Sequence, residues 1–154
     1  MKLGFFRGTG FFAWLVRVWT GGEYCHCEIV FSDGVFFGCN LDNGWSTSFH
    51  DYNAGWLAGP LWHYVDVPVS KADEAKIRAW CETEADCPYD WWGLILSQVL
   101  FWNRQNPNKW FCSEVTAAAL QQVGFLPPKP PAVQYCPSGR RGLLEHVLEI
   151  LGRQ

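Results

Sequence analysis

The sequence has little of what marks a nucleic-acid or membrane protein. It has no basic run longer than Arg140–Arg141, and its formal net charge is -3, which argues against binding driven by nucleic-acid phosphates. The apolar stretches Phe11–Val16 and Trp91–Trp102 are too short to span a bilayer. Arg7 and the early glycines interrupt the N-terminal apolar run. We therefore expect no signal peptide and no transmembrane segment, with synthesis in the cytoplasm.

The chain also lacks an internal repeat, a linker between two cores and any CxxC pair. Its 154 residues suffice for one domain with a sizeable core. A composition that is 49% hydrophobic and 17% aromatic excludes disorder. The seven cysteines are an odd number, and in a reducing compartment we expect free thiols. We predict a single domain over residues 1–154.

The succession of predicted elements favours an α+β fold with a mostly antiparallel sheet. Ser32-Asp33-Gly34 is a turn signal between two β-rich segments. Ser70 is a candidate helix N-cap, followed by two acidic residues in the first turn. The predicted strands are Lys2–Arg7, Tyr24–Phe31, Val35–Asn40, Trp45–Phe49 and Leu61–Val69, and the predicted helices are Phe11–Thr20, Ser70–Asp86, Pro88–Phe101, Cys112–Val123 and Gly142–Leu151.

Cys112 lies at the predicted start of a helix that is rich in small residues. Ala117–Ala119 would let this helix pack closely in a core, with its free N–H groups aimed at one point. A helix N-terminus lowers the pKa of a thiol and favours the nucleophilic thiolate. The Cys112 N–H could also stabilise an oxyanion. The alternative is a buried structural cysteine. We expect Glu114, in the first helical turn, to compensate the helix dipole.

His26 is the matching candidate base, on a predicted strand. Alternation of side chains puts His26 and Glu28 on one face. When the next strand pairs back, either Gly38 or Asn40 lies beside His26, depending on register. Asn40 could hold the imidazole by a hydrogen bond, the third role in a cysteine–histidine site, whereas Gly38 could not. The alternative is a histidine that makes its hydrogen bonds within the sheet and has no catalytic role.

Other candidate residues are more ambiguous. The segment Cys25–Cys27 suggests zinc, but alternation turns the histidine away from both cysteines, so we expect no metal. Tyr89 and Asp90 either open a helix or line a cleft. Trp45, in the mixed segment 41–59, belongs either to the core or to a substrate-binding wall.

The order of these motifs resembles the circularly permuted branch of the NlpC-type papain-like superfamily. This branch includes YiiX-like and YaeF-like bacterial proteins and the lecithin:retinol acyltransferase group, and its histidine precedes its cysteine. The resemblance extends from about Lys2 to Leu151. His26–Gly34 is also similar to small proteins of tailed bacteriophages, which would associate the protein with a phage virion. The segments that carry the resemblance are His26–Gly34, Pro88–Trp91 and Phe111–Val115.

The resemblance implies a papain-like core, in which an antiparallel sheet packs on the helix that carries the nucleophile. Cys112 would be the nucleophile and His26 the base. The chain departs from the acyltransferase relatives at Gly38, where they have a second histidine. The orienting role would then fall to Asn40, or next to Glu28 or a backbone carbonyl.

The function implied is a cysteine-dependent amidase or peptidase, acting on cell-wall peptides without metal or organic cofactor. One alternative is a lipid acyltransferase or thioesterase of the same fold, whose substrate carries an acyl group. The other is a catalytically degenerate phage structural or interaction protein, which the missing second histidine favours.

Overall fold

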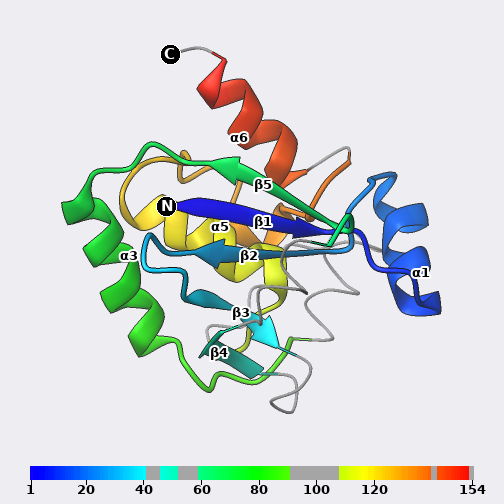
Figure 1. Ribbon diagram of the computed structural model, residues 1–154, viewed down its shortest axis with the longest axis horizontal. Helices are drawn as coiled ribbons and strands as arrows, with labels where there is room; N and C mark the ends of the chain where they lie inside the picture. The colour runs from blue at the N-terminus through cyan, green and yellow to red at the C-terminus, as the bar shows by residue number, and fades with distance from the viewer. Residues whose placement is uncertain (41–45, 52–58, 91–107, 140–141, 153–154) are drawn as a thin grey trace.

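The computed structural model describes residues 1–40, 46–51, 59–90, 108–139 and 142–152. Their strands form an antiparallel sheet in the order β4-β3-β2-β1-β5 (Figure 1). With the helices, this confirms the predicted α+β class and its antiparallel sheet. The strands are β1 (Lys2–Phe6), β2 (His26–Val30), β3 (Phe36–Asn40), β4 (Ser46–His50) and β5 (Trp62–Asp66).

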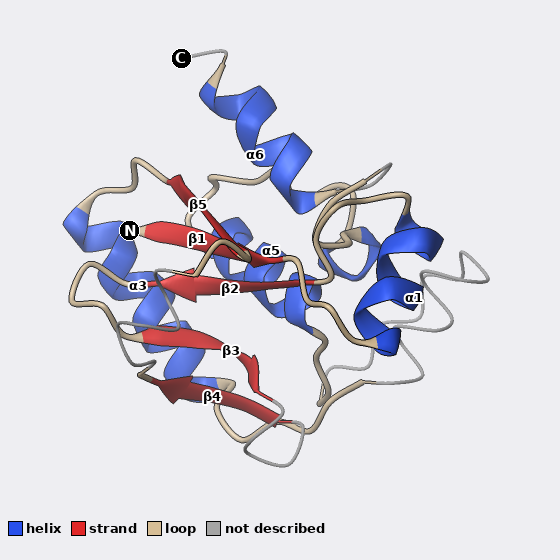
Figure 2. Ribbon diagram, turned by 45° about the vertical axis from the view of Figure 1, so that its right-hand side comes forward, coloured by secondary structure: helices blue, strands red, loops and turns tan. Residues whose placement is uncertain are grey.

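Helices cover one face of the sheet and flank its edges (Figure 2). The two that lie against this face are α3 and α5, whereas α1 lies beyond one end of the sheet (Figures 1 and 2). In the described part of the chain, no helix has the length and hydropathy to cross a bilayer. The helices are α1 (Phe11–Thr20), α3 (Lys71–Thr83), α5 (Cys112–Gln122) and α6 (Leu143–Leu151), with a short 3-10 turn, η1 (Ala132–Gln134).

The core forms where alternate strand residues meet α5. Leu3 and Phe5 of β1 and Cys27 and Ile29 of β2 are fully buried on this face, as the two-residue period of a strand requires. All of α5 from Cys112 to Leu120 is buried. The small alanines permit this close approach, and the helix start is thereby fixed against the sheet.

Local signals in the sequence explain how the chain turns. Gly34 has a φ of 89°, which a residue without a side chain adopts readily, and Asp33 Oδ1 accepts a hydrogen bond from the Val35 N–H at 3.1 Å. Ser70 caps α3, since its hydroxyl accepts from the Asp73 N–H at 3.1 Å. The predicted hairpin turn and N-cap are both confirmed.

One predicted helix start is wrong. Pro88 and Tyr89 are extended and form single bridges with Ser46 and Trp110, respectively. Pro88 restricts Cys87, the residue before it, to extended conformations. The pairing of Tyr89 with Trp110, just before α5, keeps Tyr89 extended as well. The remainder of the predicted helix, from residue 91, lies outside the described residues.

Candidate active site

Cys112 is the first residue of α5. Its predecessor Phe111 is extended and makes no capping hydrogen bond through its side chain, so the positive helix end faces the Cys112 side chain. The Thr116 hydroxyl donates to the Cys112 carbonyl at 2.9 Å. The Ser113 hydroxyl donates to the Tyr135 carbonyl at 2.7 Å. These bonds hold the first turn, and with it the thiol, in a fixed position.

Cys27 and His26 stabilise the ionised form of Cys112. Hydrogen bonding with the Cys27 side chain is the largest cause, and hydrogen bonding with His26, the His26 charge and the Cys27 backbone N–H add to it. Together they hold the pKa of Cys112 well below its ordinary 9.0, although burial opposes the shift. Cys27 is itself held on α5 by a 3.9 Å contact from its sulfur to the Thr116 hydroxyl. Cys112 is only 5% exposed, and its surroundings favour ionisation relative to an ordinary thiol.

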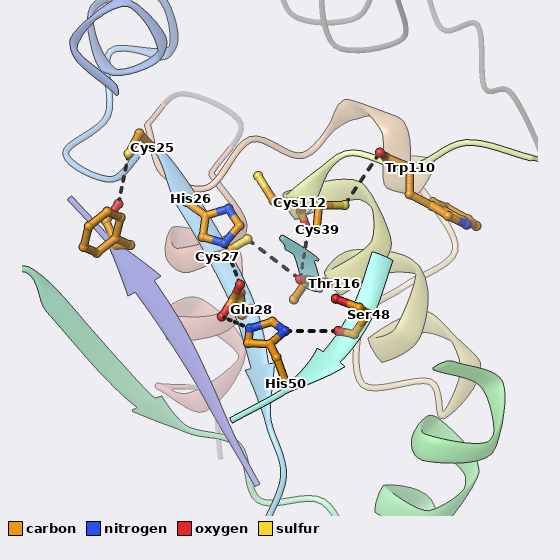
Figure 3. A network of polar contacts seen from close by, with 11 residues as sticks. Cys25, His26, Cys27, Glu28, Cys39, Ser48, His50, Trp110, Cys112 and Thr116 are labelled. Atoms are coloured by element: carbon orange, nitrogen blue, oxygen red, sulfur yellow. Dashed lines mark hydrogen bonds and ion pairs between the residues drawn. The ribbon is translucent and has the colours of Figure 1, made fainter. Parts of the chain in front are cut away.

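His26 lies between Cys112 and a buried carboxylate (Figure 3). Its Nε2 donates to Glu28 Oε1 at 2.8 Å, which leaves Nδ1 as the nitrogen on the side of Cys112. Burial alone would lower the pKa of His26, but the Glu28 charge and hydrogen bonds with Cys112 and Glu28 raise it to about 10. The two groups thus favour an imidazolium beside a thiolate, the reactive pair of cysteine–histidine enzymes.

Glu28 is the group that orients His26. It is fully buried, and His50 donates from Nε2 to its second oxygen, Oε2, at 3.3 Å. The Nδ1 of His50 lies 3.3 Å from the Ser48 carbonyl oxygen. Burial would raise the pKa of Glu28, but the charge on His26 and the hydrogen bonds from both histidines lower it to about 2. Glu28 is therefore ionised at neutral pH.

Gly38 makes room for this carboxylate. The pairing of Ile29 with Phe37 sets a register in which Glu28 is opposite Gly38. A Cβ at position 38 would lie 2.7 Å from the Cγ of Glu28, closer than side chains tolerate. Gly38 is thus the complement of Glu28, and a second imidazole, that of His50 on β4, contacts the same carboxylate.

The described residues leave two sequence candidates untested. Asn40 pairs with Ser46 through the backbone, but its side chain lies outside the part that the structure describes, as does Trp45. The orienting role of Asn40 stays a prediction, while Glu28, the second choice, contacts the imidazole directly. His50 was not among the residues predicted from the sequence, because it lies one residue beyond the predicted strand Trp45–Phe49. The available signal was its two-residue spacing from Ser48, which places both side chains on the face of Glu28 once the strand is extended by one residue.

Tyr89 and Asp90 flank the start of α5. The Asp90 N–H donates to the Trp110 carbonyl at 2.9 Å. The pKa of Tyr89 is raised, first by burial and then by negative charge on Cys112. Glu114 is fully buried, and burial followed by the Asp90 charge raises its pKa to about 8. Glu114 is thus mostly neutral at pH 7 and does not compensate the helix dipole with a charge, contrary to our expectation.

The cysteines near the site do not form a metal-binding cluster. The Cys25 thiol donates to the Phe6 carbonyl at 3.3 Å, whereas the Cys27 sulfur lies 3.9 Å from the Thr116 hydroxyl on α5. Within the described ranges, no group of three or more His, Cys, Asp or Glu side chains is arranged to hold a metal ion. All seven cysteines are free thiols.

Comparison of the chain with family models, with curated proteins and with solved structures finds no match. The family resemblance therefore depends on the segments around His26 and Cys112. A functional interpretation depends on the chemistry of those two side chains and of Glu28.

Proposed function

We propose that this protein is a cysteine-dependent amidase or peptidase with a circularly permuted, NlpC-type papain-like fold. One observation carries the proposal: the His26 imidazole lies between the Cys112 side chain and the Glu28 carboxylate, and it is hydrogen-bonded to that carboxylate at 2.8 Å (Figure 3). Cys112 is the nucleophile, His26 is the acid and base, and Glu28 is a positioning residue. The antiparallel sheet packed on α5, with the histidine before the cysteine in the chain, is consistent with the permuted fold.

In the first step, the Cys112 thiolate attacks the carbonyl carbon of an amide. A C–S bond forms while the carbonyl π electrons move onto oxygen, and the N–H groups at the start of α5 stabilise that oxyanion. When the oxyanion collapses, the C–N bond breaks and the His26 imidazolium gives its proton to the departing amine. The result is a thioester on Cys112 and a neutral imidazole.

In the second step, water hydrolyses the thioester. Neutral His26 takes a proton from the water as its oxygen attacks the thioester carbonyl. Collapse of the second oxyanion breaks the C–S bond, which releases the carboxylic acid and restores the thiolate beside the imidazolium. Throughout the cycle, Glu28 keeps the imidazole in one tautomer and orientation, because Nε2 stays hydrogen-bonded to its carboxylate.

The test is hydrolysis of peptide stems released from peptidoglycan, followed by mass spectrometry. We expect wild-type protein to cleave an amide bond, and Cys112→Ala and His26→Ala each to lose activity by roughly a thousandfold or more. Cys87→Ala is the control, because it removes a partly exposed free thiol that has no part in the proposed site. Equal activity in the Cys112 variant would refute the proposal. Hydrolysis of acyl esters but of no peptide would replace the amidase with the lipid-directed alternative.

A further inference from the structure

Helix α1 exposes its large apolar side chains. Among described residues, six large hydrophobic side chains are strongly exposed, and all but Leu148 belong to α1. Ala13 and Val16, which are smaller, are half-buried on the same helix. A helix that only covered a core would bury its large apolar side chains instead of exposing them. The exposed side chains of α1 are Phe11 (69%), Trp14 (50%), Leu15 (41%), Val18 (60%) and Trp19 (53%); we call them the α1 apolar face.

These side chains form a continuous strip. Their spacing of three, four, seven and eight residues from Phe11 places them on one side of an α-helix. The Phe11 and Trp14 rings stack with centroids 5.9 Å apart. The helix ends sharply, because Gly21 adopts a left-handed φ of 65° and its N–H returns to the Arg17 carbonyl. The α1 apolar face is thus a short, compact surface.

The composition and charge of α1 indicate what this surface binds. Tryptophan and phenylalanine are favoured at the boundary between lipid headgroups and acyl chains. Helix α1 carries no acidic residue, and its one charged residue is Arg17, in the last turn. A cation beside apolar aromatic side chains complements an anionic lipid surface.

The α1 apolar face is smaller than a typical protein–protein interface. The exposed parts of the five side chains amount to roughly 500 Å², from typical side-chain areas. A standard protein interface needs about 800 Å² from each partner, so the α1 apolar face alone is too small. Shallow insertion into a bilayer has no such requirement, since each side chain partitions into lipid separately.

We propose that α1 docks the protein on the surface of an anionic lipid bilayer, with Phe11, Trp14 and Trp19 inserted below the headgroups. The helix lies at the end of the sheet where β1 ends and β2 begins (Figures 1 and 2). A Cβ added at Gly8 would lie 2.7 Å from the Ala13 Cβ of α1 and 2.8 Å from the Cys25 sulfur, so the inner side of α1 lies close to the residue that precedes His26. Docking does not depend on catalysis by Cys112.

The experiment is flotation of the full chain with vesicles of phosphatidylcholine mixed with phosphatidylglycerol. We expect wild type to float with the vesicles, and Trp14→Ser/Trp19→Ser to bind at least about tenfold more weakly. Leu15→Ser and Leu148→Ser are a matched pair, because both leucines are exposed, by 41% and 47%, but on different helices. Only the change on α1 should weaken binding. Circular dichroism establishes that each variant is folded.

Two results would overturn the docking proposal. One is wild-type protein that does not float with the vesicles, or that binds no better than the folded double variant. The other is equal weakening by Leu15→Ser and Leu148→Ser, which would make binding a general effect of surface hydrophobicity. Sedimentation equilibrium without lipid tests whether a second copy of the chain covers the α1 apolar face instead. If wild type is a dimer, Trp14→Ser/Trp19→Ser is a monomer and wild type does not float, the face is a dimer interface.

Discussion

Replacing Glu28 with glutamine tests the proposed role of the buried carboxylate. The amide is nearly the same size, so it fits the space that Gly38 leaves, but it carries no charge. Without that charge, the imidazolium form of His26 loses its main electrostatic support. We therefore expect the pKa of His26 to fall and the pKa of Cys112 to rise, because a neutral imidazole stabilises a thiolate less well.

The size of the effect follows from the shift at His26. Its pKa rises from 6.5 to about 10 in the folded protein, which corresponds to about 5 kcal/mol in favour of the protonated form. Glu28 and Cys112 supply this energy together. If Glu28 supplies a third of it, removing the charge lowers the pKa of His26 by about one unit, so the equilibrium between the thiolate–imidazolium pair and the neutral pair shifts toward the neutral pair by roughly tenfold.

The assay is alkylation of the native protein by iodoacetamide from about pH 5 to about pH 9, with peptide mapping to isolate Cys112. We expect wild-type Cys112 to react well below its ordinary thiol pKa, and Glu28→Gln to need a pH about one unit higher to reach the same rate. Glu114→Gln is the control, since that carboxyl is equally buried but mostly neutral below its pKa of about 8. An unchanged pH profile in a folded Glu28→Gln would refute the role assigned to Glu28.

Three further predictions concern the surroundings of the same site. Gly38→Ala should displace Glu28 and cost about 1–3 kcal/mol of unfolding free energy in urea, whereas Gly10→Ala, where no atom lies within 4 Å of the added Cβ, should change stability little. Cys27→Ala should slow alkylation of Cys112 near pH 6, and Cys27→Ser should restore it, because the donor that lowers the Cys112 pKa returns. The pKa of Glu28 falls from 4.5 to about 2 on folding, so its stabilisation is present above pH 4.5 and lost as pH falls through about 2. Lowering the pH below 4.5 should therefore reduce the unfolding free energy of wild type, measured in urea, more than that of Glu28→Gln.

The local order of the chain could be read from the sequence because local interactions determine it. The turn at Asp33-Gly34 and the cap at Ser70 depend on neighbouring residues, and both are confirmed. Strands and helices were located to within a few residues, since hydrophobic periodicity fixes their type, while fraying blurs their ends. The start predicted at Pro88 is wrong because pairing with Trp110, distant in sequence, overrides the local helix signal.

By itself, the sequence determined that Cys112 begins a helix and that His26 and Glu28 share one face of a strand, because both follow from periods of 3.6 and 2 residues. Only the tertiary structure decided what surrounds them. Strand register sets Glu28 against Gly38 and supplies His50, and helix packing brings Cys27 to the sulfur. These contacts join segments far apart in sequence, and their energies depend on burial, which no local pattern specifies.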